Sequence, residues 1–389
     1  MELQPPPPVG FPVVGMIGGG QLARMTQQSA IGLGIGFSVL AARPDDSAAR
    51  VTPGTMIGDP DDPSAAVAFA RDCDVITFDH EQVAPTVLTA LTDAGAMLRP
   101  GPAALRFAQD KIEMRRELSA AGIPCPGWLA WRPEMSAEQA GEELGWPLVV
   151  KTSRGGYDGR GVWVVANPEE LRQVLSGSLP PGANWLLEEY VPFTAELSAQ
   201  VARSASGQAV AYPVVRTVQT DGICTEVVCP APGLADEVAV AAQDLALRVA
   251  GLLDVVGMLA VEMFLTDRGV LVNELAMRPH NSGHWSIDGA VASQFDNHLR
   301  AVLDLPLGSP QRLAPWVVMV NVLGGEEPDM YRAYRHVMAR DPDLNVHMYG
   351  KQVRPGRKIG HVTLLGDDLD DVLARAHHAA DYLTGTIDE

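Results

Sequence analysis

One feature near the start of the sequence constrains the fold of the first hundred residues most. It is a short apolar run that ends in three glycines and is followed by a helical pattern. Residues 12–22 read PVVGMIGGGQL, and the helical pattern that follows starts QLARMTQQ. Further apolar segments at 36–46 and 73–81 are separated by segments of helical character. Strands that alternate with helices are typical of a parallel sheet, so we expect a parallel α/β unit over roughly residues 10–105.

The first glycine loop predicts a place where backbone amides face an anion. Residues 18–23, GGGQLA, fit the pattern G-x-G-x-x-A at the start of a helix, where N–H groups point outward and the helix dipole favours negative charge. A nicotinamide dinucleotide would need an acidic residue at the end of the second strand, but ARP stands there at 42–44. The loop therefore favours another phosphate-bearing ligand over a nicotinamide oxidoreductase. A tight turn that binds nothing is the alternative.

A second glycine loop lies between two apolar strands. Lys151 ends the first strand, and GGYDGRG follows at 155–161. Four glycines in seven residues favour a mobile lid whose backbone closes on phosphates. It is no Walker A loop, because G-x-x-x-x-G-K-[ST] does not occur in the sequence. A long hairpin turn is the alternative, although a turn has no need of Tyr157, Asp158 and Arg160.

Two glutamates occupy matching positions in two adjoining apolar strands. The turn between AVEMFLT and GVLVNELA centres near residue 268, which is equally far from Glu262 and Glu274. Antiparallel pairing would place both carboxylates on one face, where like charges are destabilising unless something neutralises them. A hard divalent cation beside phosphates is the common solution, and Asn273 offers a further oxygen. The alternative is a pair of salt bridges, for instance to Arg278.

Two polar segments follow the glutamate pair. Residues 278–285, RPHNSGHW, are dense in hydrogen-bonding side chains and predict an anion or substrate pocket. Pro279 and Gly283 argue against a helix that would make His280 and His284 a metal pair. Residues 345–366 contain no acidic residue, in a chain whose net charge is −19. We expect this basic stretch to be an anion-binding arm, because Arg suits bidentate phosphate and Lys acts as a point charge. A solvated loop is the alternative.

The local patterns predict further elements. Residues 106–122 have the charge pattern of one helix, and VAYPVV at 210–215 reads as a strand. A long helix is expected over 236–254. After a Pro-rich linker that starts near residue 306, three short strands and a final helix are expected.

Composition limits the class of protein. The 389 residues are 47% apolar and 20% charged, which is ordinary for a globular chain of two or three domains. The net charge of −19 disfavours nucleic acid and anionic membrane surfaces as partners. The four cysteines are scattered without CxxC, so neither a disulfide framework nor a zinc site is expected. No apolar stretch is long enough to span a membrane, and MELQPPPPVG lacks the features of a secretory signal, so we expect a cytoplasmic protein.

These motifs occur together in one known family. The chain resembles the ATP-grasp superfamily over nearly its whole length and, within it, the 5-(carboxyamino)imidazole ribonucleotide synthetases. The motifs that carry the resemblance are GGGQLARM, VVKTSRGGYDGRGVW, LLEEYVPFTAELS, VNELAMRPHNSGHWSIDGA and VRPGRKIGHVTL. Each motif is weak alone, whereas their order and spacing together are specific.

The resemblance implies a fold of α/β and α+β parts. These are an N-terminal parallel α/β (pre-ATP-grasp) domain at 1–105, a central ATP-grasp domain at 106–305 and a small β-rich C-terminal domain at 306–389. The implied activity is that of an ADP-forming ligase of purine biosynthesis, which carboxylates 5-aminoimidazole ribonucleotide through carboxyphosphate with ATP and bicarbonate. ATP and Mg²⁺ are the implied cofactors, with Mn²⁺ as an alternative metal. The implied assembly is a homodimer, with transient hand-over of the product to the mutase of the next step.

The resemblance also carries site residues over to matching positions of this sequence. The ATP site is matched by Lys111, Lys151, Gly156, Gly159, Gly161, Glu188, Glu189, Tyr190, Val191, Glu196, Gln219, Asn273 and Glu274. The metal ligands are matched by Glu262 and Glu274. The catalytic pocket for bicarbonate and ribonucleotide is matched by Tyr157, Asp158, Arg160, Arg278, His280 and Lys358. Further substrate contacts are implied for Gly20, Gln21, Leu22, Glu81, Lys351, Arg354 and Arg357.

The sequence departs from the family pattern at three places. DHEQV at 79–83 stands where Glu-Phe-Glu-Asn-Val is expected, Gln219 stands where a histidine is common, and Met277 replaces a proline. These departures bear on contacts to ribose and phosphate. The alternatives are another ATP-grasp ligase, such as formate-dependent glycinamide ribonucleotide transformylase, and a nucleotide-binding regulator. The transformylase family shares the glutamate pair, but Tyr-Asp-Gly-Arg and His-Asn-Ser-Gly-His-Trp are not expected there. The intact glutamate pair and basic arm argue against the regulator.

Overall fold

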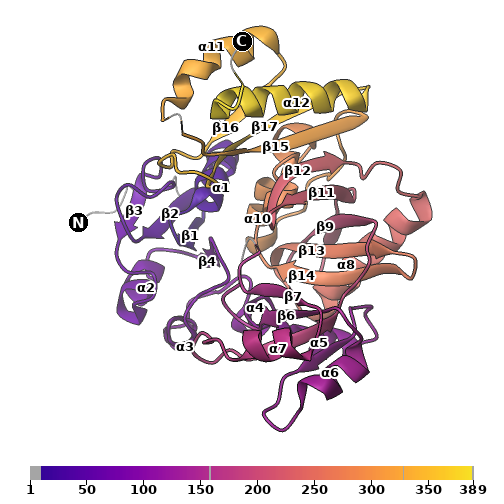
Figure 1. Ribbon diagram of the computed structural model, residues 1–389. Coiled ribbons are helices and arrows are strands. Elements are labelled where there is room, and N and C mark those ends of the chain that lie inside the picture. Colours follow the sequence, from indigo (N-terminus) through magenta and orange to yellow (C-terminus); the bar gives the residue numbers. More distant parts are fainter. Residues whose placement is uncertain (1–9, 157–158, 327, 388–389) are drawn as a thin grey trace.

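A parallel sheet forms the N-terminal part of the molecule, as the alternating pattern predicted. The structure is a computed structural model that describes residues 10–156, 159–326 and 328–387. The sheet has the order β3-β2-β1-β4 and lies among the indigo and purple segments of Figure 1. Its strands are β1 (Val13–Ile17), β2 (Gly36–Ala41), β3 (Gly54–Ile57) and β4 (Val75–Phe78). The helices of this part are α1 (Gln21–Leu33), α2 (Pro63–Ala70) and α3 (Pro85–Asp93).

The segment at 106–122 forms parts of two helices, so the prediction of a single helix was wrong. Helix α4 (Pro102–Gln109) ends where α5 (Lys111–Ala120) begins. Asp110 between them has extended backbone, with φ −132° and ψ 110°, and its side chain accepts the N–H groups of Ile112 and Glu113. Such an N-cap starts a new helix. The break makes Lys111 the first residue of α5.

A small antiparallel sheet carries the second glycine loop. Its strands are β5 (Trp128–Ala130), β6 (Leu148–Thr152), β7 (Val162–Val165) and β8 (Trp185–Glu189), in the order β5-β8-β6-β7. Helices α6 (Ala137–Leu144) and α7 (Pro168–Leu175) pack on it through a core that includes Leu148, Val150 and Leu187. The loop joins β6 to β7, so Lys151 lies on the strand just before it.

A nine-stranded antiparallel sheet forms the centre of the molecule, with the order β14-β13-β9-β11-β12-β15-β17-β16 and β10 paired to β9. The central strands are β9 (Ala195–Arg203), β10 (Ala209–Ala211), β11 (Val215–Thr220), β12 (Ile223–Cys229), β13 (Gly257–Thr266) and β14 (Gly269–Ala276). The expected helix is α8 (Asp236–Leu252), and α10 (Gln294–Val302) also packs on this sheet. VAYPVV is not one strand, because Pro213, which has no N–H to donate, separates β10 from β11.

The C-terminal strands continue this central sheet. They are β15 (Trp316–Leu323), β16 (Asn345–Met348) and β17 (Lys358–Gly366), and β15 pairs with β12. The expected final helix is α12 (Leu369–Thr384), which covers β15 and β17. The short helices η2 (Met330–Ala333) and α11 (Tyr334–Arg340) were not predicted. The central sheet contains strands from both sides of residue 305 in the sequence. The domain boundaries at 105 and 305 stay predictions.

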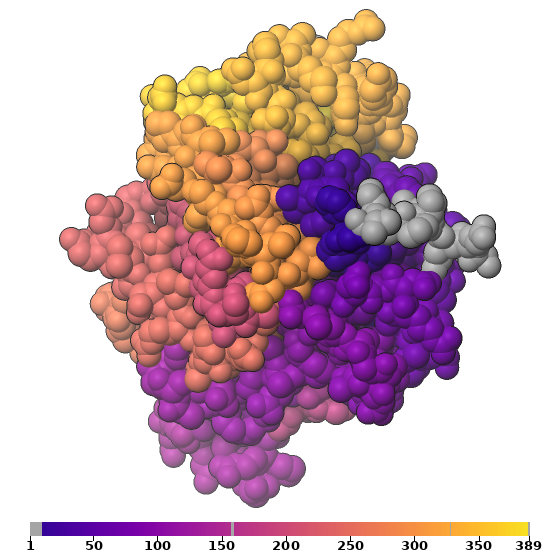
Figure 2. Space-filling view, turned by 180° about the vertical axis from the view of Figure 1, so that it is seen from behind, coloured from indigo at the N-terminus to yellow at the C-terminus, as the bar shows by residue number. Residues whose placement is uncertain are grey.

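The N-terminal and C-terminal parts touch directly. Ser47 Oγ donates to the Tyr349 carbonyl at 2.6 Å, and Arg50 donates to the Gly350 carbonyl at 2.8 Å. From behind, the indigo and orange segments meet on one face of the molecule (Figure 2). Among the described residues, no helix combines the length and the apolar character needed to cross a membrane.

Candidate active site

A cavity of about 730 Å³ lies between the small sheet and the central sheet. Its apolar walls include Val149, Val162 and Val164 from one sheet and Phe264 and Leu275 from the other. Most predicted site residues line it, namely Glu81, Lys111, Lys151, Gly156, Gly159, Glu188, Glu189, Tyr190, Val191, Glu196, Gln219, Glu262, Asn273, Glu274, Arg278, His280 and Lys358. An apolar cleft with charged groups gathered along it suits a ligand that is flat at one end and anionic at the other.

The two glutamates face each other across the β13–β14 pair, as their spacing predicted. Glu262 and Glu274 are direct partners, and the register shifts immediately after Glu262. Neither has the salt bridge to Arg278 that was the alternative: Lys111 Nζ lies 2.7 Å from Glu274 Oε1, and Arg278 Nε lies 2.8 Å from Glu81 Oε2. Glu274 thus has a close ion pair with Lys111, whereas Glu262 lies 3.8 Å from His280 Nδ1.

The surroundings move the pKa values of the two carboxyls in opposite directions. Burial, with Glu274 and Glu196 nearby, raises the pKa of Glu262 to about 8. Burial acts the same way on Glu274, but Lys111 and Lys151 outweigh it and lower the pKa of that carboxyl. Glu262 is therefore the group that a bound cation would relieve most.

Four polar residues form a closed circuit of hydrogen bonds, and three of them line the cavity. Arg115 Nε donates to Glu188 Oε1 at 2.6 Å, and Lys151 Nζ lies 2.7 Å from Glu188 Oε2. Lys151 Nζ also donates to Asn273 Oδ1 at 2.9 Å, and Arg115 Nη2 donates to the Asn273 carbonyl at 2.8 Å. The circuit joins α5, both strands β6 and β8 of the small sheet, and β14. It fixes the ammonium of Lys151 and holds the pKa of Glu188 at about 2, against the effect of burial, through Arg115 and Lys151.

The base of the second glycine loop is tied to the start of α5. The Lys111 N–H donates to the Ser153 carbonyl at 2.9 Å, and Arg154 Nε lies 2.8 Å from Asp110 Oδ2. Gly156 and Gly159 line the cavity, whereas Arg160 and Gly161 are not among its lining residues. Tyr157 and Asp158 lie outside the described residues.

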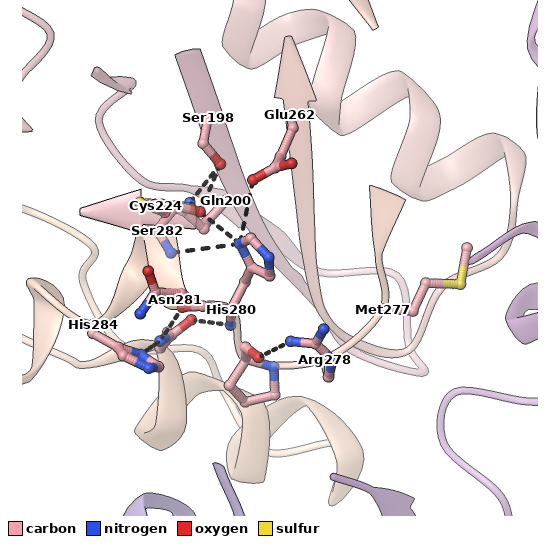
Figure 3. Close-up of polar contacts among 12 residues, drawn as sticks. Ser198, Gln200, Cys224, Glu262, Met277, Arg278, His280, Asn281, Ser282 and His284 are labelled. Carbon is pink, nitrogen blue, oxygen red and sulfur yellow. Dashed lines mark hydrogen bonds and ion pairs between the residues drawn. The ribbon is translucent and has the colours of Figure 1, made fainter. Parts of the chain in front are cut away.

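The segment after β14 is held by buried neighbours. The carboxylate of Glu81 accepts from the Met277 N–H at 3.1 Å as well as from Arg278. His280 Nδ1 lies 2.8 Å from Ser282 Oγ and 3.8 Å from Glu262 Oε1, and Figure 3 shows the ring between these two groups. Burial, with Arg278 and Lys358 nearby, lowers the pKa of His280 well below its usual value.

The second histidine of this segment, His284, has other neighbours than His280. Residues 281–283 form the short η1 (Asn281–Gly283), and α9 (Ser286–Gly289) follows. His284 is fully buried, and its Nδ1 lies 2.9 Å from Gln294 Nε2. The rings of His280 and His284 therefore contact different side chains.

At the first glycine loop, the anion expected at the helix start is a side chain of the protein. The Asp79 carboxylate accepts the N–H groups of Gly20 and Ala23, each at 2.8 Å. Those amides are not free for a ligand in this arrangement, so the expectation that they face a phosphate was wrong for Gly20. Leu22 is buried, and neither it nor Gln21 lines the cavity.

The basic stretch is divided between two places. Lys358, the first residue of β17, lines the cavity. Lys351 lies outside it and contacts the Gln21 side chain. Arg354 and Arg357 bond to Gln352 at 3.4 and 3.2 Å and are not cavity-lining residues.

Sequence reasoning missed the residues that hold the predicted ones in place. Arg115 is the clearest case, and its position one helical turn after Lys111 was an available signal. Gln294 brackets the His280 backbone by accepting its N–H and donating to its carbonyl, each at 2.8 Å. No local pattern pointed to Gln294, because it lies on a separate helix.

Comparisons with known proteins agree with this architecture. Family models match the ribonucleotide synthetase preATP-grasp domain at 12–109, the ATP-grasp domain at 116–295 and the phosphoribosylaminoimidazole carboxylase C-terminal domain at 317–375. N5-carboxyaminoimidazole ribonucleotide synthase of Mycobacterium tuberculosis is 50% identical over 377 residues, which cover 96% of this chain and 88% of the relative.

Solved structures of the same kind are similar over the whole chain. The synthetase of Thermus thermophilus superposes with a TM-score of 0.84 at 34% identity, covering 97% of this chain and 99% of the other. The Aspergillus clavatus synthase in complex with ADP and 5-aminoimidazole ribonucleotide gives 0.86 at 31% identity, with the same coverage.

The fold and the site define an ATP-grasp enzyme, an ATP-dependent ligase. Within that class, the chain belongs to the family of N5-carboxyaminoimidazole ribonucleotide synthases. This family works in purine biosynthesis and converts 5-aminoimidazole ribonucleotide to N5-carboxyaminoimidazole ribonucleotide with ATP.

Proposed function

We propose that this chain performs the reaction of its family in the cavity described above, with bicarbonate as the carbon source. A bicarbonate oxygen attacks the γ-phosphorus of ATP, and ADP leaves. The exocyclic amine of 5-aminoimidazole ribonucleotide then attacks the carbonyl carbon of carboxyphosphate, phosphate leaves and the nitrogen loses a proton. The observation that carries the proposal is that one cavity gathers three lysines, a glutamate pair and the segment with Arg278 and His280.

The glutamate pair fits Mg²⁺, or Mn²⁺ in its place. Burial and two neighbouring carboxylates raise the pKa of Glu262 to about 8, which a cation would reverse. Within the described residues, no three His, Cys, Asp or Glu side chains gather around one point. Nucleotide oxygens would complete the coordination, as is usual for Mg²⁺. When bound, the cation neutralises charge on the transferring phosphoryl group.

Lys151 and Lys111 would hold the phosphates. Lys151 uses two of its three N–H groups on Glu188 and Asn273, so one remains to meet a phosphate oxygen. A well-placed donor of this kind is worth about 3 kcal/mol of transition-state stabilisation. Glu188 is occupied by Arg115 and Lys151, so we assign the adenine edge to the neighbouring residues 189–191 and the ribose hydroxyls to Glu196. Gln219 lines the same cavity.

Arg278, His280 and Lys358 would hold bicarbonate and then carboxyphosphate. This intermediate reacts quickly with water, so the loop at 155–161 is assigned as the lid that excludes solvent. Tyr157, Asp158 and Arg160 belong to that lid, and we assign Asp158 to orient the attacking amine. The variant Asp158→Asn tests this role, because wild-type turnover in that variant would remove it.

The ribonucleotide would lie on the side of the cavity where Glu81 and Arg278 meet. The contact between Gln21 and Lys351 brings the first glycine loop and the basic stretch together at one place. We assign contacts with the ribonucleotide in this region to Gly20, Gln21, Leu22 and Lys351, and contacts with its phosphate to Arg354 and Arg357. Gly20 would contribute by letting the ribonucleotide approach closely, since its N–H is bonded to Asp79 and its carbonyl accepts the Arg24 N–H.

The test is ADP release from MgATP and bicarbonate, with and without 5-aminoimidazole ribonucleotide. The proposal predicts release that depends strongly on the ribonucleotide. Release stimulated instead by glycinamide ribonucleotide with formate would replace it with the transformylase activity. An absence of ADP release under every condition would overturn the assigned activity and favour a nucleotide-binding regulator.

We also propose that the chain acts in the cytoplasm as a homodimer and hands its unstable product to the mutase of the next step. The net charge of −19 argues against nucleic acid and anionic membranes as partners. Light scattering after gel filtration measures the assembly. Faster conversion when the mutase is present than when it is added later would support hand-over.

A further inference from the structure

Buried polar side chains that do not line the cavity hold the imidazole of His280. Ser282 Oγ lies 2.8 Å from His280 Nδ1, from Ser198 Oγ and from Gln200 Nε2. Gln200 Nε2 also donates to Ser198 Oγ, at 2.9 Å. Ser198, Gln200 and Ser282 are at most 1% exposed, so these groups must satisfy one another (Figure 3).

The hydrogen bonds in this group have a direction. The Gln200 amide carries two hydrogens and gives one to each serine oxygen. Ser282 Oγ is thereby an acceptor, and its own hydrogen can go either to Ser198 Oγ or to His280 Nδ1. The Ser282 backbone N–H points at the same nitrogen, 3.4 Å away. Because this backbone donor faces Nδ1, that nitrogen carries the lone pair, the Ser282 hydroxyl donates to it as well, and the ring hydrogen is on Nε2.

The opposite orientation of the Gln200 amide would cost more. As it stands, Gln200 Oε1 is the one atom of that amide without a partner among the described residues. Turning the amide would pair the oxygen but leave both N–H groups buried and unpaired. Orphaned N–H groups are rarer than under-satisfied carbonyls, because each lost donor costs its desolvation. The direction from Gln200 through Ser282 to His280 is therefore the favoured one.

We propose that Ser282, oriented by Gln200 and Ser198, fixes His280 in the tautomer with its hydrogen on Nε2. Ser282 and Gln200 are then positioning residues, which act on the reaction through His280. On the proposed function, on which this step rests, the Nε2–H donates to an oxygen of bicarbonate or carboxyphosphate in the cavity.

The same tautomer keeps Glu262 available. His280 Nδ1 lies 3.8 Å from Glu262 Oε1. A hydrogen on Nδ1 would attract that carboxylate and compete with a cation for it. A lone pair at Nδ1 cannot do so, which leaves Glu262 free to face the nucleotide side of the cavity.

The direct test is nuclear magnetic resonance of the full chain labelled with ¹⁵N in histidine, without nucleotide or metal. The two ring nitrogens of a neutral imidazole give well-separated signals that report which one carries the hydrogen. The His280→Gln variant assigns the His280 signals. We expect the Nε2–H form in the wild type and a substantial fraction of the Nδ1–H form in Ser282→Ala. Ser286→Ala is the matched control, because the Ser286 hydroxyl donates to the Gly283 carbonyl and not to the ring.

A kinetic measurement separates positioning from simple damage. Loss of one oriented donor predicts that Ser282→Ala raises KM for bicarbonate about tenfold, while KM for ATP changes less than about twofold. Ser282→Thr, which keeps a hydroxyl, should restore part of the bicarbonate affinity and the Nε2–H signal. Equal melting temperatures of the variants show that the fold is intact.

Three results would overturn the proposal. The first is an Nδ1–H or doubly protonated His280 in the wild type at neutral pH. The second is a Ser282→Ala variant whose tautomer does not change. The third is a variant that loses ATP and bicarbonate affinity alike. A wild type that shows the Nε2–H form but no bicarbonate-dependent turnover would instead refute the proposed function, so the two failures are distinguishable.

Discussion

Gly20 has no room for a side chain because the carboxylate of Asp79 already occupies the start of α1. A Cβ on Gly20 would lie 2.0 Å from Asp79 Oδ2. The same carboxylate accepts the N–H groups of Gly20 and Ala23. The glycine is therefore required by an acid of its own chain, and the two residues act as one structural unit.

The first prediction tests this unit. Gly20→Ala should destabilise the protein by about 1–3 kcal/mol, because the added methyl forces the carboxylate away from the helix start. Gly32→Ala in the same helix is the control. Nothing lies within 4 Å of its Cβ position, so it should be neutral or stabilise by up to about 1 kcal/mol. Urea unfolding measures both. A Gly20→Ala variant of wild-type stability would contradict the assignment.

Arg115 should be among the most costly positions to truncate. It is fully buried and holds Glu188 and the Asn273 carbonyl. Arg115→Met leaves the buried Glu188 with Lys151 alone, so we expect a loss of about 3–5 kcal/mol in the free energy of unfolding. The exposed neighbour Arg116, paired with Glu113, is the control and should cost less than about 1 kcal/mol. Similar losses in the two variants would show that the circuit adds no stability.

Lys151 should matter for catalysis more than for folding. Lys151→Met removes a phosphate donor and should lower the rate of ADP release about a hundredfold or more. Glu188 keeps Arg115 as a partner in this variant, so the fold should persist. Circular dichroism checks the fold, and a coupled assay measures ADP. A variant with wild-type ADP release would remove Lys151 from the phosphate site.

The raised pKa of Glu262 predicts that the stability of the protein without metal and nucleotide depends on pH. Its pKa rises from 4.5 to about 8 on folding, so the folded state binds this proton more tightly than the unfolded state. The stabilisation is complete below pH 4.5 and is lost progressively as the pH rises to about 8. Glu262→Gln should flatten this decline and be the more stable protein at pH 8.5, by on the order of a few kcal/mol. Unfolding at several pH values measures it, and parallel curves for the two proteins would contradict it.

A weaker pH effect is expected at the ion pair between α12 and β12. His377 Nε2 lies 2.6 Å from Glu226 Oε2. The hydrogen bond to Glu226 raises the pKa of His377, so its contribution is complete below pH 6.5 and fades as the pH rises past the raised value. His377 and Arg216 outweigh burial and lower the pKa of Glu226, so that contribution fades in acid. His377→Gln should cost less than about 1 kcal/mol near pH 6, because the imidazole is 46% exposed. The cost should vanish at pH 9, and a cost that persists there would mean packing rather than charge.

Elements and pairings that depend on local patterns were predictable. The alternation at 36–46 and 73–81 indicated the parallel sheet, and the turn near residue 268 set the register that makes Glu262 and Glu274 partners. The motifs then located most residues of the cavity. Where local signals competed, prediction failed: Asp110 breaks an otherwise continuous helical pattern with its own cap. Pro213 likewise breaks an apolar run that reads as one strand.

The supporting contacts could not be predicted because they join distant segments. Asp79 meets Gly20 across 59 positions, and Arg115 meets Glu188 across 73. Each such contact depends on how two elements pack, which no local period encodes. The sequence correctly indicated that the start of α1 favours an anion. What the sequence concealed is that the chain supplies that anion itself.

The pairing of β15 with β12 has a consequence for chains that end early. One edge of β12 pairs with β11, and on the other edge residues 226–229 pair with 317–320 of β15. A chain that ends before β15 therefore exposes a row of unpaired backbone groups along that second edge. Such an open edge recruits strands from other molecules. The part of the protein from β15 onward thus covers an edge of the central sheet that would otherwise be open. A premature stop codon before Trp316 should yield insoluble aggregates, whereas a stop codon after β17 should remove α12 and leave the pairing of β12 with β15 in place.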